Sequence, residues 1–385
     1  MGSFLNPGNT AFKEAVNAQI YIDKTELIDF TNQFINTPQK FICCSRPRRF
    51  GKSMAADMLL AYYNKESESA KLFAGLTIEK RKSFKKHLNK YDIIYFDIQE
   101  CSDNAESIEN TIEYITKSVL KELSKAYPKA VHSNTKTVSE ALDNINQATG
   151  NRFVVIIDEW DALFRAAPEQ KEIHEKYITF LRSLFKGAGA RRFIALAYIT
   201  GILPIKKHGR IPVLDNFMEY TMINPYQTAS CFGFTEEEVQ GLCQTYNKDF
   251  IDVKRWYDGY KLNGLHIYNP FNITNLILQG DTNGYWLQSG TYGTIKDLIN
   301  TGSDELYEDI LKLLTEQKVE ADLYFSRIDI EYSDDKNNMI TLLAHLGYLT
   351  YNNDEKKIEI PNQEISIELH KAIKTLINNN KGAFP

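Results

Sequence analysis

The chain contains the stretch Arg46-Pro47-Arg48-Arg49-Phe50-Gly51-Lys52-Ser53. The short apolar run Phe41 to Cys44 precedes this stretch, and Met54 to Tyr63 follow it with helical spacing. Strand, tight loop and helix, in this order, are the context that a phosphate-binding loop requires. Gly51 allows the backbone to approach a phosphate, while successive amides and the helix N-terminus face the anion. The stretch therefore predicts a nucleotide phosphate site.

The residue types of this loop suit separate tasks. Lys52 can reach the terminal phosphates of a nucleotide, and the Ser53 hydroxyl can bind Mg²⁺. Arg46 stands where the pattern G-x-x-x-x-G-K-[ST] has its first glycine, so we expect a different backbone geometry at this position. The predicted nucleotide-binding residues are Arg46, Pro47, Arg48, Arg49, Phe50, Gly51, Lys52, Ser53 and Met54.

A second apolar strand is predicted at Phe153 to Ile157, and it ends in Asp158-Glu159. This is the pattern of a Walker B motif, and the loop above has that of a Walker A motif. We expect Asp158 to hold Mg²⁺ through water, together with Ser53. We expect Glu159 to polarise the water that attacks the terminal phosphate, a role that a nucleotide kinase lacks. The predicted cofactors are ATP and Mg²⁺.

Further apolar runs predict three more strands, at Tyr91 to Ile98, Phe193 to Gly201 and, more weakly, Glu219 to Ile223. Apolar residues at helical spacing predict helices at about 104–127 and 137–148. Five strands that alternate with helices predict an α/β fold with a parallel sheet covered on both faces. We expect the strand that ends in Thr200 to insert beside the loop strand, as in glutamate-containing P-loop ATPases of the ASCE and AAA-like type.

Thr200, at the end of its strand, is a candidate sensor of the terminal phosphate. A threonine in this place also has an ordinary structural explanation, and the two interpretations weigh equally. With Thr200 included, the predicted catalytic residues are Lys52, Glu159 and Thr200, and the predicted metal ligands are Ser53 and Asp158.

Two acidic residues before and within the sheet allow two interpretations each. The segment Tyr21 to Thr25 either walls off the adenine of a nucleotide or lets Asp23 or Thr25 cap the following helix. Asp97, near the end of its strand, either faces the ligand crevice or has a structural role, which is the commoner case.

Three arginines, Arg46, Arg48 and Arg49, concentrate positive charge beside the predicted phosphate site. One of them can stabilise the leaving phosphate, or the arginines can pair with Asp161 and Asp97. We favour the pairing slightly.

Composition excludes several classes of protein. A length of 385 residues with 43% hydrophobic residues is enough for more than one core. The formal net charge of -5 disfavours a general polyanion binder. The five cysteines show no C-x-x-C spacing, which disfavours a disulfide scaffold or a zinc site. No apolar run approaches the length of a membrane span. We therefore expect a cytoplasmic protein without a membrane partner.

The second half of the chain predicts two further regions after a P-loop core at 1–230. A helical lid-like region at 231–300 starts with Thr235 and Glu238, which form a capping-box pattern, and is rich in aromatic residues, including Tyr285 to Gly290. Helix, strand, turn and strand at 301–385 resemble a winged helix. Residues 331–385 carry eight acids against six lysines, so a contact with protein is favoured over one with nucleic acid.

The combined motifs resemble a prokaryotic AAA-ATPase-like family that is often fused to a C-terminal PD-(D/E)XK nuclease-like domain. The motifs that carry the resemblance extend along nearly the whole chain and are Tyr21 to Thr25, Arg46 to Ser53, Asp158 to Asp161, Thr200-Gly201, Phe232 to Thr235, Trp256 to Tyr260 and Tyr268 to Phe271. An Arg-Pro-Arg-Arg-Phe opening is typical of this family, which accounts for Arg46. No motif of the nuclease-like domain is among them, so we expect no nuclease chemistry.

These observations predict a regulatory ATPase that hydrolyses ATP to ADP and phosphate with Mg²⁺ and thereby drives a conformational switch. The alternative is a nucleotide-gated module that binds DNA or protein and in which hydrolysis is vestigial. The predicted partners are ATP and ADP, with a protein partner or self-association as a further expectation. A P-loop kinase is disfavoured because Glu159 follows Asp158.

Overall fold

The computed structural model describes residues 2–205, 207–208, 211–212, 214–280, 284–285, 299, 303–323 and 336–380. The chain forms two compact units. Unit 1 contains Met1–Ser45 and Lys52–Tyr220, and unit 2 contains Arg46–Gly51 and Thr221–Pro385. The division interrupts the predicted phosphate loop, because Arg46–Gly51 belong to unit 2 while the strand before them and the helix after them belong to unit 1.

Unit 1 is built on a five-stranded sheet whose strands follow the order β2-β3-β4-β1-β7. All neighbouring strands in it are parallel. The strands are β1 Phe41–Ser45, β2 Asp92–Asp97, β3 Phe153–Asp158, β4 Ile194–Gly201 and β7 Met218–Tyr220. The parallel α/β fold of a P-loop protein is confirmed. The insertion of β4 beside β1 is confirmed as well, with Cys44 opposite Thr200.

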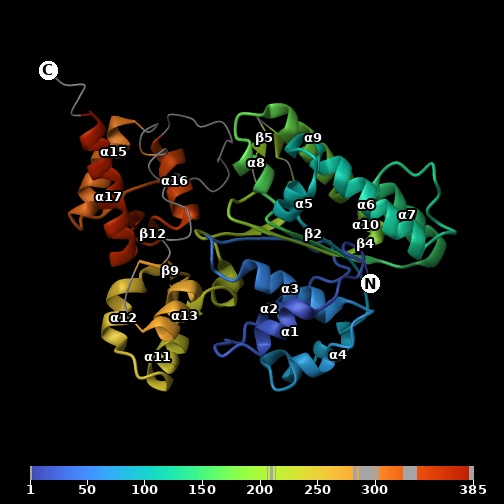
Figure 1. Cartoon of the computed structure of the whole chain (residues 1–385), viewed down its shortest axis with the longest axis horizontal. Helices are drawn as coiled ribbons and strands as arrows, with labels where there is room; N and C mark the ends of the chain where they lie inside the picture. Colours follow the sequence, from blue (N-terminus) through green and yellow to red (C-terminus); the bar gives the residue numbers. More distant parts are fainter. Residues whose placement is uncertain are drawn as a thin grey trace. The chain divides into compact units, whose positions relative to one another are not determined.

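Helices cover both faces of this sheet (Figure 1). Helices α1 to α4 lie on one face, and the other face is covered mainly by the longer helices among α5 to α10. The bounds are α1 Thr10–Val16, α2 Glu26–Asn32, α3 Lys52–Tyr63, α4 Phe84–His87, α5 Ile98–Asn104, α6 Thr111–Ala126, α7 Val138–Thr149, α8 Ala162–Ala166, α9 Lys171–Phe185 and α10 Ala188–Phe193. A short hairpin of β5 Lys207–His208 and β6 Ile211–Pro212 follows β4.

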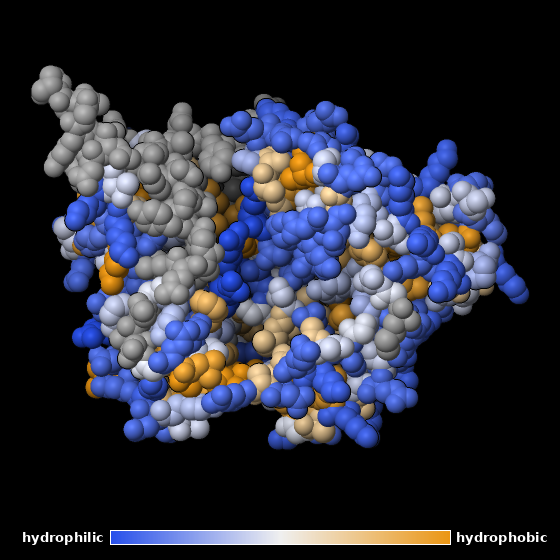
Figure 2. Space-filling view, in the orientation of Figure 1, coloured by the Kyte–Doolittle hydropathy of each residue, from blue (hydrophilic) through white to orange (hydrophobic). Residues whose placement is uncertain are grey.

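The outer helices are amphipathic, as their spacing of apolar residues predicts. Helix α6 buries Ile115, Val119 and Leu123, three residues four positions apart. The surface of α9 that is visible in Figure 2 is mainly hydrophilic, whereas the apolar residues of this helix are buried. The large sheet and these buried stripes form the core of unit 1.

The predicted helix at 104–127 starts later than expected. The backbone is extended at Ala105 and Ser107, and a short 3-10 helix, Ile108–Asn110, separates α5 from α6. The Asp97 side chain caps α5, because it accepts a hydrogen bond from the backbone N–H of Glu100 at 2.9 Å. Asp97 therefore has the structural role, as the N-cap of α5.

Neither Asp23 nor Thr25 caps α2 with its side chain. Asp23 Oδ1 accepts from the backbone N–H and the hydroxyl of Thr25, at 2.8 and 2.6 Å. Asp23 Oδ2 accepts from the backbone N–H of Thr77 at 2.6 Å. The predicted cap was wrong because both side chains form tertiary bonds. These hold the segment before α2 against residues 77–78.

Unit 2 contains two three-stranded sheets with the orders β8-β10-β9 and β11-β13-β12. Its helices are α11 Glu236–Thr245, α12 Phe250–Tyr257, α13 Pro270–Gln279, α15 Asp304–Leu314, α16 Lys336–Leu346 and α17 Gln363–Asn380. Its strands are β8 Phe234–Thr235, β9 Tyr260–Leu262, β10 Leu265–Tyr268, β11 Val319–Glu320, β12 Thr350–Asn352 and β13 Lys357–Glu359. The predicted capping box of Thr235 and Glu238 at the start of α11 is confirmed.

The lid-like region is more than helical, because β9 and β10 form a hairpin within it. Asn263 and Gly264 connect the two strands, with φ of 51° and 80°. An Asn-Gly pair in the left-handed conformation is a strong hairpin signal, and the aromatic density around it hid this signal in the sequence. Of the predicted aromatic stretch, residues 286–290 lie outside the described residues.

The C-terminal part of unit 2 has the predicted succession of helix, strand, turn and strand, from α16 through the β12–β13 hairpin, and α17 follows it. These elements and α15 share an apolar core, with members such as Leu306, Ile340, Ile358 and Leu369. The winged-helix assignment and the boundaries at 230 and 300 stay predictions. A bilayer-crossing helix would need a long apolar run, and the part of the chain that the structure describes has none.

Candidate functional site

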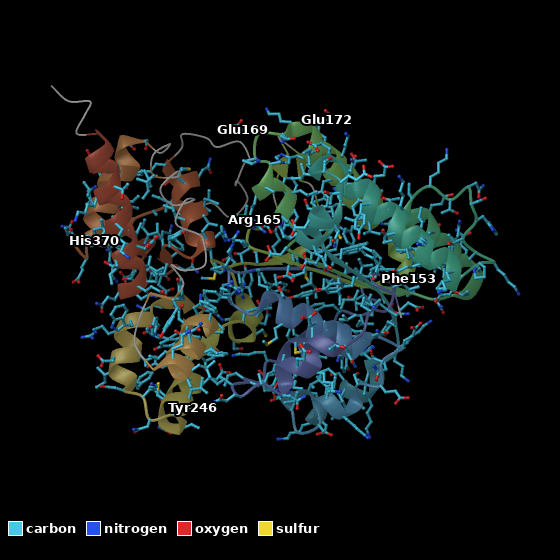
Figure 3. The ribbon with its side chains drawn as sticks, viewed as in Figure 1. Phe153, Arg165, Glu169, Glu172, Tyr246 and His370 are labelled. Atoms are coloured by element: carbon cyan, nitrogen blue, oxygen red, sulfur yellow. The ribbon has the colours of Figure 1, made fainter. Side chains whose placement is uncertain are left out.

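The predicted catalytic and metal residues of unit 1 come from the carboxyl ends of its parallel strands. Asp158 ends β3, Thr200 is the next-to-last residue of β4, and Lys52 and Ser53 open α3. Figure 3 labels Phe153, at the amino end of β3, and Arg165 on α8, toward the opposite end of the sheet. Ligands of open α/β sheets bind outside these carboxyl ends, so the predicted residues lie where a ligand is expected.

The backbone of the phosphate loop has two residues in the left-handed conformation. These are Arg49, with φ of 69°, and Gly51, with φ of 86°. A Cβ atom added at Gly51 would meet no atom within 4 Å, so glycine is required there by the backbone angle and not by a lack of space. Left-handed residues within a loop turn successive N–H groups toward one point, which is the geometry of an anion-binding loop.

Lys52 is buried, although its side chain is a cation. Its Nζ atom lies 3.9 Å from Glu159 Oε1. Burial lowers the pKa of Lys52, while the carboxylates of Glu159, Asp158 and Asp161 act in the opposite direction. The ammonium group is therefore held by carboxylates in a place with little water, where an anion would be attracted strongly.

Asp158 is a fully buried carboxylate. Its Oδ1 atom accepts from the backbone N–H of Glu159 at 2.9 Å. Among the described residues, no side chain or backbone group donates a regular hydrogen bond to Oδ2. Burial raises the pKa of Asp158 to about 7, and the nearby Ser53 hydroxyl acts in the opposite direction. A bound dication would stabilise the charged form, so Asp158 and Ser53 suit a magnesium site.

Glu159 lies in the left-handed region with φ of 48°, which costs a residue of this type roughly 1–2 kcal/mol. Its Oε2 atom accepts from Arg165 Nη2, and its Oε1 atom faces Lys52. Arg165 Nε also donates to Asp161 Oδ2 at 3.1 Å. Both oxygens of the predicted catalytic carboxylate therefore face cations.

Thr200 is fully buried, and its hydroxyl donates to the backbone carbonyl of Cys44 at 2.9 Å. This bond joins the ends of β4 and β1, which is the structural explanation that the sequence allowed. The hydroxyl oxygen keeps lone pairs with which it can accept a further bond. The proposed role of Thr200 as a sensor stays a prediction.

The residues after Glu159 hold the segment that follows Thr200. The backbone N–H of Trp160 donates to Thr200 O at 3.0 Å, and its indole Nε1 donates to Leu203 O at 3.1 Å. A Cβ atom at Gly201 would lie 2.5 Å from Asp161 Oδ1 and 2.7 Å from Trp160 Cδ1. Only glycine fits at Gly201, because Trp160 and Asp161 occupy the space beside it.

Arg46 and Arg49 have partners other than the favoured Asp161 and Asp97. In unit 2 the buried Arg46 donates from Nη2 to Thr228 O at 3.1 Å and to Thr228 Oγ1 at 3.0 Å. Its guanidinium carbon also lies 4.9 Å from the centre of the Phe232 ring. Asp161 accepts a hydrogen bond from Arg165 and Asp97 caps α5, and the favoured pairing of the arginines with these two acids stays a prediction.

Further contacts attach the loop to unit 2. The Arg49 guanidinium lies 4.9 Å from the Phe271 ring centre. Phe50 is buried in an apolar cluster, and its ring centre lies 5.3 Å from that of Tyr260. Burial of a phenylalanine side chain contributes about 1.5–3 kcal/mol, so Phe50 alone is a substantial anchor. Arg46, Arg49 and Phe50 thus have side-chain partners in unit 2, and no such partner was predicted from the sequence.

Arg165 was not among the residues predicted from the sequence. A signal was present, because Asp161 and Arg165 are four residues apart at the start of a helix, a spacing that favours an ion pair. The left-handed Glu159 turns its carboxylate toward this arginine, and the sequence contains no indication of that turn.

The geometry agrees with a comparison to known families. The family described as Predicted AAA-ATPase matches residues 8–210, more than half of the chain. The chain belongs to this AAA-ATPase-like family. The matched range contains the phosphate loop, Asp158-Glu159 and Thr200, so the resemblance seen in the motifs is confirmed. As a member of this family, the chain is an ATPase-type nucleotide-binding module.

A curated relative comes from Azotobacter chroococcum mcd 1 and is described as an uncharacterized protein in the vnfD 5'region. It is 24% identical over 367 residues, and the match covers 92% of this chain and 66% of that protein. This chain therefore spans just under two thirds of the length of its relative.

Two solved structures are distantly similar to the whole chain. The ORC2 protein of Aeropyrum pernix, in ADPNP-ADP complexes, is 11% identical with a TM-score of 0.32, and the match covers 94% of this chain and 98% of that one. Cdc6p from Pyrobaculum aerophilum is 8% identical with a TM-score of 0.29, and the match covers 97% and 99%.

Proposed function

We propose that this AAA-ATPase-like chain binds ATP with Mg²⁺ and hydrolyses it to ADP and phosphate, and that the nucleotide state sets the conformation of unit 2. One observation carries the hydrolytic part of the proposal. Lys52, Asp158 and Glu159 lie together at the carboxyl ends of the sheet, and no group among the described residues donates a regular hydrogen bond to the buried Asp158 Oδ2. Phosphoryl transfer to water needs these three groups: a cation that holds the phosphates, a carboxylate that holds Mg²⁺ and a carboxylate that orients the attacking water.

Each residue has a separate role in the proposed reaction. The amides of the loop and Lys52 hold the phosphates. Lys52 then contacts phosphate in place of its partner Glu159. Ser53 and Asp158 would hold Mg²⁺, which neutralises charge on the phosphate oxygens when it is bound. Glu159 accepts a hydrogen bond from the attacking water and orients it. Thr200 keeps the end of β4 in place and contacts the terminal phosphate.

The proposed switch is supported by the attachment of the loop. Arg46, Arg49 and Phe50 contact Thr228, Phe232, Phe271 and Tyr260 of unit 2, while Lys52 opens α3 of unit 1. A phosphate that tightens the loop backbone therefore acts on unit 2 through covalent bonds. Hydrogen bonds from a charged donor such as Arg46 contribute about 1.5–3 kcal/mol each. The bonds of Arg46 to Thr228 can therefore couple a change in the loop backbone to the rest of unit 2.

The first test is a phosphate-release assay on the whole chain. In magnesium buffer we expect steady release of phosphate from ATP, and we expect EDTA to stop it because Asp158 then lacks its cation. The assay is repeated with double-stranded DNA, which we expect to leave the rate unchanged because residues 331–385 carry more acids than lysines. Absence of release from folded protein that binds ATP would contradict the hydrolytic function.

A second test addresses the switch. Thr228→Val removes one acceptor of Arg46 and preserves the shape of the side chain. We expect Mg²⁺ and ATP to slow hydrogen exchange at residues 226–268 in the wild type, and we expect the variant to lose at least about half of this protection. Helix α7, which contains no residue of the proposed site, serves as the internal control. If ATP protects α3 and leaves residues 226–268 unchanged in the wild type, the switch is wrong.

The alternative is a nucleotide-gated module that contacts DNA or a protein and hydrolyses ATP slowly or not at all. The succession of α16, the β12–β13 hairpin and α17 supports it, because it suits a winged helix. Binding of DNA that depends on ATP, without any phosphate release, would favour this function. The acidic balance of the region instead favours a protein partner in the cytoplasm, or a second copy of the chain.

A further inference from the structure

Arg165 joins two carboxylates that the proposed function uses in different ways. Its Nη2 atom donates to Glu159 Oε2, and its Nε atom donates to Asp161 Oδ2 at 3.1 Å. The side chain is only 18% exposed, so this is not a loose surface pair. A guanidinium is planar and presents its donors in a rigid fork, so it fixes the position of one carboxylate relative to the other.

Asp161 provides the fixed end of this arrangement. It is fully buried, and it accepts backbone bonds from Ile202 at 3.3 Å and from Leu203 at 3.0 Å. These two residues directly follow β4, so Asp161 is attached to the central sheet. Arg165 therefore fixes the Glu159 carboxylate relative to Asp161, and hence relative to the end of β4.

We propose that Arg165 is a positioning residue for Glu159, an inference that rests on the proposed hydrolysis. Glu159 Oε1 faces Lys52 at 3.9 Å, whereas Oε2 is held by Arg165. When the phosphates of ATP attract Lys52, Oε1 loses its cation and is free to accept a bond from water. Oε2 stays on Arg165, so the carboxylate keeps one orientation instead of rotating toward solvent.

The test measures turnover and ATP affinity separately. Because a misplacement of about 1 Å at a reacting group reduces rates by about 100-fold, we expect Arg165→Ala to lower kcat by about 10- to 100-fold. We expect the Kd for ATP to change by no more than about twofold, since the side-chain partners of Arg165 are the carboxylates of Glu159 and Asp161. Arg165→Lys retains a cation without the fork, so it should recover part of the rate. Arg192→Ala breaks an exposed pair with Asp143 and should leave kcat unchanged.

A double variant shows whether Arg165 acts through Glu159. If it does, Glu159→Gln with Arg165→Ala should be no slower than Glu159→Gln alone, because effects of residues that act as a unit do not add. Multiplicative losses would overturn the inference, and so would an Arg165→Lys variant that binds ATP and turns over at the wild-type rate. A faster Arg165→Ala variant would make Arg165 a restraint and also overturn it. A wild type without any phosphate release would contradict the proposed function itself.

Discussion

Glu159→Gln should slow phosphate release severely and leave ATP binding intact. The amide has almost the shape of the carboxylate, but it cannot take a proton or attract water with a full negative charge. General base catalysis contributes roughly 10²- to 10⁴-fold, so we expect kcat to fall by at least about 100-fold. Calorimetry with ATP in magnesium buffer should show a Kd within a fewfold of the wild-type value, since Glu159 does not hold the nucleotide.

The control for this variant is Glu172→Gln. Glu172 lies in the first turn of α9 and pairs with Lys176 at the surface, and Figure 3 labels it. This variant loses the same charge and should keep the wild-type rate. If Glu159→Gln turns over ATP as fast as the control does, Glu159 is not the residue that activates water.

Lys52→Ala should remove nucleotide binding. The Lys52 ammonium is buried and held by carboxylates, and burial lowers its pKa, so in the site an anion has a strong advantage over water as its partner. Loss of a buried charged contact costs about 2–5 kcal/mol, so the Kd for ATP should rise on the order of 100-fold or more. Calorimetry with ATP and ADP measures the change.

Lys121→Ala is the matched control, because Lys121 lies on the exposed side of α6. Its Kd for ATP should equal that of the wild type. Thermal unfolding should show that Lys52→Ala is folded, as the variant removes a cation from the protein interior. ATP binding by Lys52→Ala with an unchanged Kd would refute the assignment of the phosphate loop.

Local patterns were sufficient for the elements of unit 1. The run Phe153 to Ile157 is apolar throughout because β3 is buried on both faces, and such runs identify parallel strands. The polar end of β4 at Thr200 predicted the position of this strand beside β1. Strand ends converge at one edge of a parallel sheet, so the motifs alone were enough to bring Lys52, Asp158 and Glu159 together.

Local sequence patterns gave wrong predictions where a side chain bonds to residues that lie far away in the sequence. Asp23 and Thr25 have the composition of a helix cap, but they bond to one another, to Thr77 and to Ile78. The start of α6 was misplaced because the stripe of apolar residues continues across a segment in which the backbone is extended. In both cases a tertiary bond or backbone break outweighed the local preference.

The sequence by itself determined the class of fold and predicted which residues would surround a nucleotide, since these depend on short-range spacing and on the burial of whole strands. Only the tertiary structure decided what holds those residues. Arg46 turns to Thr228, and Arg165 joins Glu159 to Asp161. A guanidinium can satisfy its five donors in many ways, and its choice depends on which acceptors the folded chain brings within about 3 Å.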